Sequence, residues 1–240
     1  MTLTLFIDTT LSGAALALVS YEAVGKRVQP FVRIQAQKGA ADSAICRMLA
    51  EGLSELGKEI HDIRSVVVSC GPGSFTGIKV GLAWAYGFQA ARKDNVLVGL
   101  SSLAEGQAEL ARTHAPQKIV VLLPISRREA FLCSQDEEAK VCYASIVLFS
   151  EAAETVLKAH SESSFCLIAT EFSLRDWFLK LGLRIREYAM AEFMQIAMDG
   201  LIAKAETLDL CSLQSRMILP AYFKKSTVEE KLNLKDPHVS

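Results

Sequence analysis

The chain has 240 residues, of which 50% are hydrophobic, and its formal net charge at pH 7 is -1. This length predicts one large domain or two small lobes with substantial cores, and the near-neutral charge excludes a strong overall field toward nucleic acid or anionic membrane. The six cysteines form no Cys-x-x-Cys pair, so we predict free thiols in a reducing compartment and not disulfides or a zinc site.

The first residues enter an apolar run directly, with no basic segment ahead of a long hydrophobic one, which predicts no signal peptide. No apolar run in the sequence is long enough to cross a bilayer. We therefore expect a cytoplasmic protein without a membrane contact.

In the first half of the chain, short alternating or apolar runs separated by turns predict three consecutive strands, at 3–8, 14–20 and 31–36. Helical spacing of Ile45, Met48 and Leu49 predicts an amphipathic helix over 42–57. The remaining elements are expected to alternate strand, helix, strand, helix, at 65–70, 76–91, 96–100 and 101–112.

The second half repeats this order of elements with a different amino-acid sequence. Three strands are predicted at 118–125, 129–135 and 143–149. Alternating helices and strands follow at 150–160, 163–170, 173–182, 183–188 and 190–206.

Each half therefore reads β-β-β-α-β-α-β-α, which predicts an α/β protein of two lobes with mixed sheets flanked by helices. This order resembles the actin-like, sugar-kinase and heat-shock ATPase superfamily. We expect an N-terminal lobe over 1–101, a C-terminal lobe over 102–223 and a polar tail over 224–240.

The segment CGPGSFTGIKVGLAWAYGF, residues 70–88, raises the question of phosphate binding. A loop between a strand and a helix start is a natural anion site. The spacing matches neither the P-loop nor Gly-x-Gly-x-x-Gly, because the positions that need Gly or Lys carry other residues, such as Thr76. We interpret this loop and the end of the first strand as vestigial phosphate loops, with candidate residues Asp8, Thr9, Gly73, Ser74 and Thr76.

Asp8 ends the first strand and has two possible roles. It could hold Mg²⁺ through water, or it could accept hydrogen bonds from the turn at Thr9 and Thr10, which we favour. The glycines argue against a nucleotide clamp, because only Gly106, Gly182 and Gly200 follow Gly99. The second half therefore offers no glycine-rich turn for adenosine, and we expect no catalytic residue and no cofactor.

Small residues line the helix after the loop. Gly77, Gly81 and Ala85 share one face, and Ala83, Gly87 and Ala91 share a neighbouring one. Interior glycines cost helix stability, so another backbone must come close: either the helix's own sheet or a partner protein. The candidate partner interface comprises Ile45, Met48, Leu49, Gly77, Ile78, Gly81, Leu82 and Ala85. On this hypothesis Gly81→Leu would block docking while leaving a folded monomer.

Other sites have little support. The four histidines form no His-x-x-x-His pair, so we expect no metal site. Ser74 lies outside a Gly-x-Ser-x-Gly context, which disfavours a serine nucleophile. Arg127-Arg128 and Lys224-Lys225 are small basic pairs; solvated surface is the first interpretation, and a share in an RNA path is the alternative.

The runs LFIDTT, GPGSFTGIKVGLAWAYGF and LVGLSSLAE together resemble the TsaB family of the bacterial tRNA threonylcarbamoyladenosine system. The resemblance covers residues 1–106 and is thin afterwards, where PAYFK at 220–224 is similar to the family's Pro-x-Tyr-x-Arg.

The resemblance implies a non-catalytic subunit that dimerises with a TsaD-type catalytic paralogue through the helices predicted at 42–57 and 76–91. With a TsaE-type ATPase, that complex transfers threonylcarbamoyl to the adenosine beside the anticodon of tRNAs that read ANN codons. The resemblance further implies a homodimer when the chain is alone, and tRNA contact only through the complex.

The sequence departs from the family at two places. Ala41 stands where the family has His, and Ser126 stands where it has Asp. Two further functions stay open at this stage: a small-molecule kinase of the same superfamily, motivated by the turn after Asp8 and the loop 71–77, and a peptidase, for which the residues supply no nucleophile and base.

Overall fold

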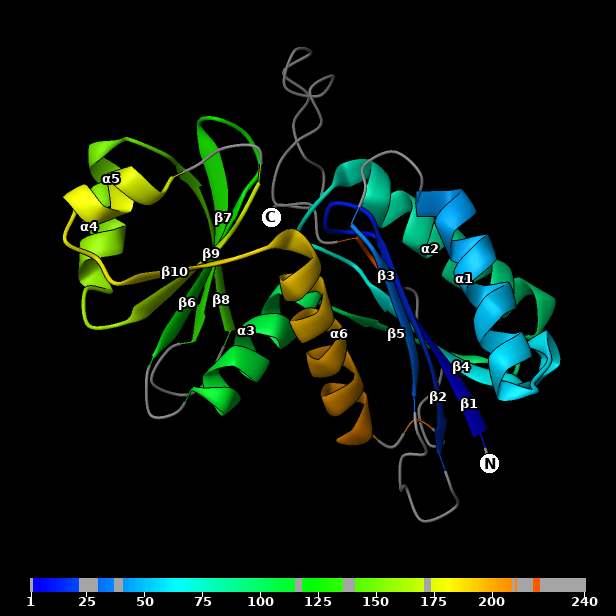
Figure 1. Ribbon diagram of the computed structural model, residues 1–240. Helices are drawn as coiled ribbons and strands as arrows, with labels where there is room; N and C mark the ends of the chain where they lie inside the picture. The colour runs from blue at the N-terminus through cyan, green and yellow to red at the C-terminus, as the bar shows by residue number, and fades with distance from the viewer. Residues whose placement is uncertain are drawn as a thin grey trace, which may run out of the picture.

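Two five-stranded mixed sheets organise the chain in the computed structural model (Figure 1). The structure describes residues 2–21, 30–36, 41–114, 118–135, 141–170, 174–208, 210 and 218–220. The first sheet has the order β3-β2-β1-β4-β5. Its strands are β1 (Thr2–Asp8), β2 (Ala14–Tyr21), β3 (Phe31–Gln35), β4 (Ile63–Ser69) and β5 (Val96–Leu100).

The second sheet repeats this topology, with the order β10-β9-β6-β7-β8. Its strands are β6 (Ile119–Pro124), β7 (Glu129–Gln135), β8 (Val141–Val147), β9 (Ser164–Ile168) and β10 (Ile185–Tyr188). In each sheet the three strands that come first along the chain form an antiparallel meander, and the later two run parallel to the first of them. The duplicated α/β order expected from the sequence is confirmed.

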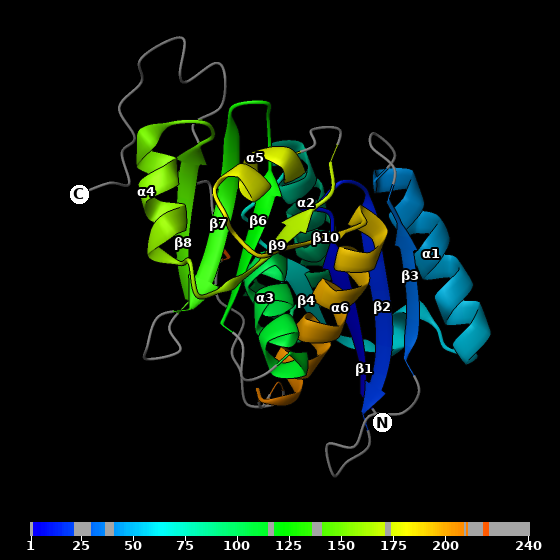
Figure 2. The ribbon, with the colours of Figure 1, turned by 60° about the vertical axis from the view of Figure 1, so that its left-hand side comes forward.

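Helices cover both faces of the sheets. They are α1 (Ala41–Leu56), α2 (Phe75–Ala91), α3 (Ser102–Thr113), α4 (Glu151–Ala159), α5 (Arg175–Lys180) and α6 (Met190–Glu206), with a 3-10 turn η1 (Ile60–Asp62). Figure 1 shows α1 and α2 on the outer face of the first sheet and α4 and α5 on the outer face of the second. Figure 2 shows α3 and α6 between the two sheets.

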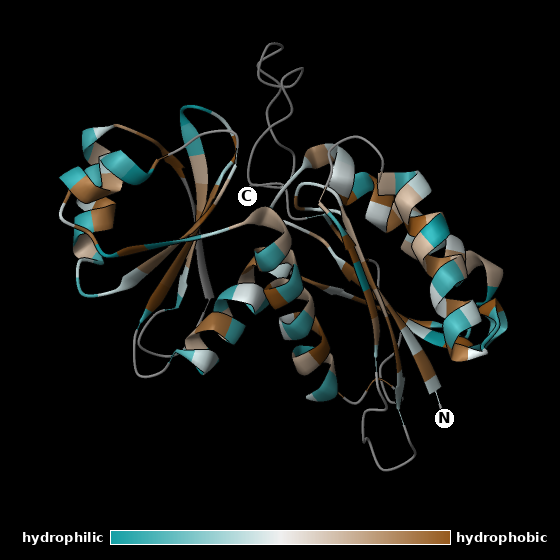
Figure 3. Cartoon of the chain, in the orientation of Figure 1, coloured by the Kyte–Doolittle hydropathy of each residue, from teal (hydrophilic) through white to brown (hydrophobic). Residues whose placement is uncertain are grey.

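The central helix pair joins the two halves into one continuous core. Its apolar side chains pack with Phe6 and Val67 of the first sheet and with Val121 and Phe131 of the second. Figure 3 shows brown and teal residues alternating along α3 and α6, the pattern of helices that bury one face. The predicted boundary at residue 101 therefore falls directly before a helix that both halves share, and the division into lobes stays a prediction. The predicted tail, 224–240, lies outside the described residues.

Gly106 and Gly200 have a packing role in this helix pair. A Cβ at Gly106 would lie 2.8 Å from the ring of Phe193, and a Cβ at Gly200 would overlap the carbonyl of Glu105. Only glycine lets the two helix backbones come this close. Among the described helices, none is long and apolar enough to cross a membrane.

Candidate functional site

The candidate site lies where β1 and β4 end, at the edge of the first sheet that carries the carboxyl ends of its parallel strands. Asp8 is the last residue of β1 and is 1% exposed. Its Oδ1 accepts hydrogen bonds from the backbone nitrogen of Thr10 at 2.8 Å and from the Thr10 hydroxyl at 2.7 Å. The turn role that we favoured for Asp8 is therefore the one that these contacts support.

A buried hydroxyl cluster closes this carboxylate off from solvent. The Thr10 hydroxyl lies 2.9 Å from that of Ser102 and 3.2 Å from that of Ser69, and Ser69 donates to Ser102 at 2.9 Å. Burial raises the pKa of Asp8, and its Oδ2 has no hydrogen-bond partner among the described residues. The cluster ties the ends of β1 and β4 to the first turn of α3.

The glycine-rich loop packs against the turn after Asp8. The backbone nitrogen of Ser74 donates to the carbonyl of Thr10 at 2.6 Å, and the Thr9 hydroxyl donates to the carbonyl of Gly77 at 2.6 Å. The Ser74 hydroxyl caps α2 by accepting from the nitrogen of Gly77 at 3.2 Å. The nitrogens of Ser74 and Gly77, two donors that could have bound a phosphate at this helix start, are thus engaged by the protein itself.

Gly73 and Gly77 make this approach possible. A Cβ on either residue would overlap a backbone carbonyl oxygen, that of Thr10 for Gly73 and that of Thr9 for Gly77. Thr76, the remaining candidate in the loop, is exposed. The structure therefore brings Asp8, Thr9, Gly73 and Ser74 together and leaves Thr76 at the surface.

The first small-residue face of α2 turns inward. Gly77, Gly81 and Ala85 are buried, and a Cβ at Gly81 would lie 2.6 Å from the Thr9 hydroxyl and 3.3 Å from Val68. Of the two interpretations, contact with the helix's own sheet is the one observed. The expectation that Gly81→Leu leaves a folded monomer is wrong, because leucine has no room there.

The eight residues predicted to form a partner interface all lie in the core between α1, α2 and the first sheet. Their side chains or backbones are buried: Ile45, Met48, Leu49, Gly77, Ile78, Gly81, Leu82 and Ala85. Within the chain these residues contact their own lobe, and their part in a partner interface stays a prediction.

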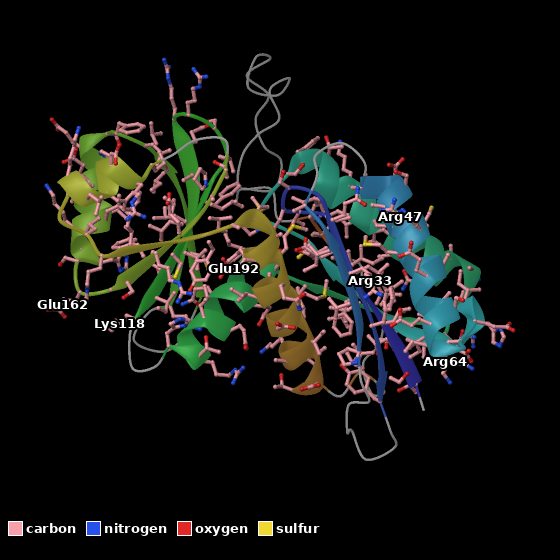
Figure 4. The ribbon with its side chains drawn as sticks, viewed as in Figure 1. Arg33, Arg47, Arg64, Lys118, Glu162 and Glu192 are labelled. Atoms are coloured by element: carbon pink, nitrogen blue, oxygen red, sulfur yellow. The ribbon has the colours of Figure 1, made fainter. Side chains whose placement is uncertain are left out.

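The outward faces of α1 and α2 are formed by different positions. On α2 the second small-residue face, Ala83, Gly87 and Ala91, is exposed, and no described atom lies within 4 Å of a Cβ built at Gly87. On α1 the exposed residues include Cys46 and Arg47, and Figure 4 shows Arg47 at the outer side of the lobe.

Sequence reasoning missed the contribution of a distant segment beside α2. The Tyr86 hydroxyl donates to the carbonyl of Ile218 at 2.7 Å and accepts from its nitrogen at 2.9 Å. Ile218 also fills the space beside Gly99, where a Cβ would lie 2.6 Å from it. No local sequence pattern indicates a contact between residues so far apart.

The two departures from the family pattern have structural counterparts. Ala41 is the first residue of α1 and packs against the core of the first lobe. Ser126 takes the turn role of an aspartate, because its hydroxyl accepts from the backbone nitrogen of Arg128 at 3.1 Å. Within the described part of the chain, no cluster of His, Cys, Asp and Glu could hold a metal ion.

Comparison with known proteins identifies a family whose model matches this chain. The model of the family described as TsaD, tRNA N6-adenosine threonylcarbamoyltransferase, matches residues 39–162. A search of curated proteins found no match.

Solved structures match over nearly the whole chain. A Pseudomonas aeruginosa protein described as uncharacterized, with similarity to peptidase YeaZ, is 15% identical with a TM-score of 0.59, and the match covers 93% of this chain and all of that one. YeaZ from the same organism is 14% identical with a TM-score of 0.57, covering 91% and 100% of the two chains. The fold class expected from the sequence is confirmed, and the family match and these structures together support the TsaB-like resemblance.

Proposed function

The chain belongs to the TsaD family, tRNA N6-adenosine threonylcarbamoyltransferase, and from this premise we propose that it serves tRNA modification as a non-catalytic subunit. It binds a TsaD-type catalytic paralogue and supports threonylcarbamoyl transfer to the adenosine beside the anticodon of ANN-decoding tRNAs. A TsaE-type ATPase joins the complex, tRNA is contacted through the complex, and the chain alone forms a homodimer in the cytoplasm.

One observation carries the non-catalytic part of the proposal: the presumed phosphate loop is occupied by the protein's own backbone. The Thr10 carbonyl accepts from Ser74, and the Thr9 carbonyl fills the space beside Gly77. A triphosphate would have to displace these contacts and the buried Asp8 turn before it could reach the helix start. Such a displacement costs several hydrogen bonds, each worth about 0.5–1.5 kcal/mol.

The later glycines support the same proposal. Gly106 and Gly200 serve the contact between α3 and α6, and Gly182, with a φ of 71°, follows the end of α5. All three therefore have structural uses in the second half. None supplies a glycine-rich turn facing the first lobe's loop.

The proposed partner surface is the outward side of α1 and α2. Gly87 is exposed inside a helix and has open space above it, so its cost in helix stability is not repaid by any described contact within the chain. Ala83, one turn earlier, is likewise exposed. A small-residue face of this kind lets a partner helix approach closely.

Two measurements test the proposal. Co-purification from the native host should recover the TsaD-type paralogue with this chain, and its failure would rule out the subunit role. Calorimetry with ATP and Mg²⁺ should show no binding by the isolated chain; micromolar binding with turnover would favour the kinase alternative.

A matched pair of variants tests the surface. Gly87→Leu adds a large side chain to the exposed face of α2 and should weaken complex formation by about tenfold or more, the effect of about 1.4 kcal/mol. Ala159→Leu adds a side chain at the exposed end of α4 in the second lobe and should leave complex formation unchanged. If both variants bound the partner with equal affinity, α2 would not be part of the interface.

A further inference from the structure

The second lobe carries a group of aromatic, apolar and basic side chains that the proposed function does not use. It consists of the exposed Arg127, Arg128, Val147 and Phe149 and the half-buried Trp177, and we name it the aromatic–arginine patch. We propose that this patch binds unpaired nucleotides of RNA, with the arginines on phosphates and the aromatic pair on a base. The inference rests on the proposed function for the identity of the RNA, a tRNA, and deepens it by assigning a contact surface on this chain.

The arginines are presented by a short, hydrogen-bonded turn between β6 and β7. The carbonyl of Glu129 accepts from the nitrogens of Ile125 at 2.9 Å and Ser126 at 3.2 Å, and the Ser126 hydroxyl accepts from Arg128. The carbonyl of Arg128 in turn accepts from Leu148, which brings the end of β8 beside the turn. A shallow depression of about 450 Å³ lies there, lined by Ser126, Arg127, Arg128, Glu129 and Val147.

Both arginine side chains are exposed, and neither guanidinium is paired with a carboxylate among the described residues. Glu129, the nearest acid in sequence, accepts a hydrogen bond from the Ser126 hydroxyl at 3.4 Å. A guanidinium presents a rigid fork of donors that matches phosphate oxygens. Two of them on one turn provide charge for consecutive phosphates.

Phe149 supplies an aromatic face next to the turn, because it directly follows Leu148, whose nitrogen donates to the carbonyl of Arg128. It is 55% exposed, and its φ of 60° lies in the left-handed region that a bulky side chain rarely adopts. Its ring packs on that of Trp177, with centroids 4.8 Å apart, and Trp177 packs on the buried Phe178 at 5.2 Å. The aromatic ring is therefore held outward by a stack that reaches into the core.

Unpaired RNA is the occupant that these features favour. Bases of single strands stack on exposed aromatic side chains while arginines follow the backbone. The apolar exposure at Val147 and Phe149 is small and borders two positive charges that no described carboxylate pairs, unlike the charge-depleted centre of a protein interface.

The position of the patch would let one ligand reach both the patch and the glycine-rich loop. The turn between β6 and β7 and the loop before α2 lie at the same end of the molecule (Figure 1), at the edges that carry the carboxyl ends of the parallel strands. Lys118, which precedes β6, lies at the opposite end of the second lobe (Figure 4).

Fluorescence anisotropy with the full chain and a short single-stranded oligoribonucleotide at low salt tests the proposal. Arg127→Ala/Arg128→Ala should weaken binding and reduce the slope of log affinity against log salt by about 1.4, the value for two phosphates of a single strand. Phe149→Gly should weaken binding by about tenfold, within the range for loss of one stacked base. Glycine accepts a φ of 60°, so the backbone of this variant should keep its conformation, and circular dichroism with thermal unfolding checks that it folds.

The double variant Lys93→Ala/Lys118→Ala removes the same charge from exposed positions outside the patch and is the control. Equal losses in the control and the patch variants, or no RNA binding by the wild type, would overturn the proposal. If patch variants kept RNA binding but lost the TsaD-type partner, the patch would be a protein interface and the proposal would again be wrong. Partner binding is measured separately, so failure of the subunit role with patch-dependent RNA binding would overturn only the proposed function.

Discussion

Two glycine-to-alanine substitutions in α2 should change stability in opposite directions. Both Gly77 and Gly87 lie in this helix, where alanine is favoured over glycine by about 0.5–1 kcal/mol. At Gly87 no described atom lies within 4 Å of the new Cβ, so the gain should be realised. At Gly77 the Cβ would overlap the carbonyl oxygen of Thr9 and lie 2.9 Å from its carbon, a backbone group that cannot rotate away.

The magnitudes follow from these distances. Overpacking costs about 1–3 kcal/mol, and a backbone obstacle is at the upper end, so Gly77→Ala should lose about 2 kcal/mol net. At about 2–4 °C per kcal/mol for a chain of this size, we expect its melting temperature to fall by about 4–8 °C and that of Gly87→Ala to rise by about 1–4 °C.

Thermal and urea unfolding of the full chain, followed by circular dichroism, measure both variants against the wild type. The reasoning also predicts that Gly87→Ala keeps the secondary structure unchanged. If Gly77→Ala were as stable as the wild type, the close approach between α2 and the turn after β1 would not exist in solution. If Gly87→Ala were less stable than the wild type, other atoms would have to occupy the space beside Gly87 in solution.

Three further predictions concern the candidate site and its surroundings. Because burial raises the pKa of Asp8, the folded chain binds the carboxyl proton more tightly than the unfolded chain does. The free energy of unfolding should therefore fall as the pH rises from 3.8, the ordinary pKa of aspartate, through the raised pKa of the folded chain. Asp8→Asn should flatten this pH dependence in urea titrations. Tyr86→Phe should weaken the docking of Ile218 by about 1–3 kcal/mol, since two hydrogen bonds worth about 0.5–1.5 kcal/mol each are lost, and hydrogen exchange at the Ile218 amide should speed up accordingly. Ser126→Asp should keep the melting temperature within about 1 °C, because a carboxylate can accept from Arg128 as the hydroxyl does, whereas a clear loss would show that the turn needs serine.

Local periodicity in the sequence was sufficient to place the strands and helices. The helix predicted at 76–91 spans Phe75–Ala91, the strand predicted at 96–100 spans Val96–Leu100, and the last helix begins and ends where it was expected. These elements are long or sharply bounded by Gly, Pro and capping residues, so neighbouring side chains alone determine them. The family resemblance followed from the same residues, since the glycine loop and the helix after it are contiguous.

The direction in which each helix face points could not be predicted from the sequence. The two small-residue faces of α2 have similar composition, yet the face of Gly81 is buried on Val68 and that of Gly87 is exposed. Likewise the stripe of Met48 and Leu49 on α1 packs into its own lobe.

By itself, the sequence determined the duplicated order of strands and helices and the family, because both depend on residues close together along the chain. Only the tertiary structure decided which face of α2 is buried on its own sheet, that Ser69 and Ser102 join Asp8, and that Ile218 returns to Tyr86. Burial and these contacts depend on how distant segments pack, and a pattern that is read one window at a time does not contain that information.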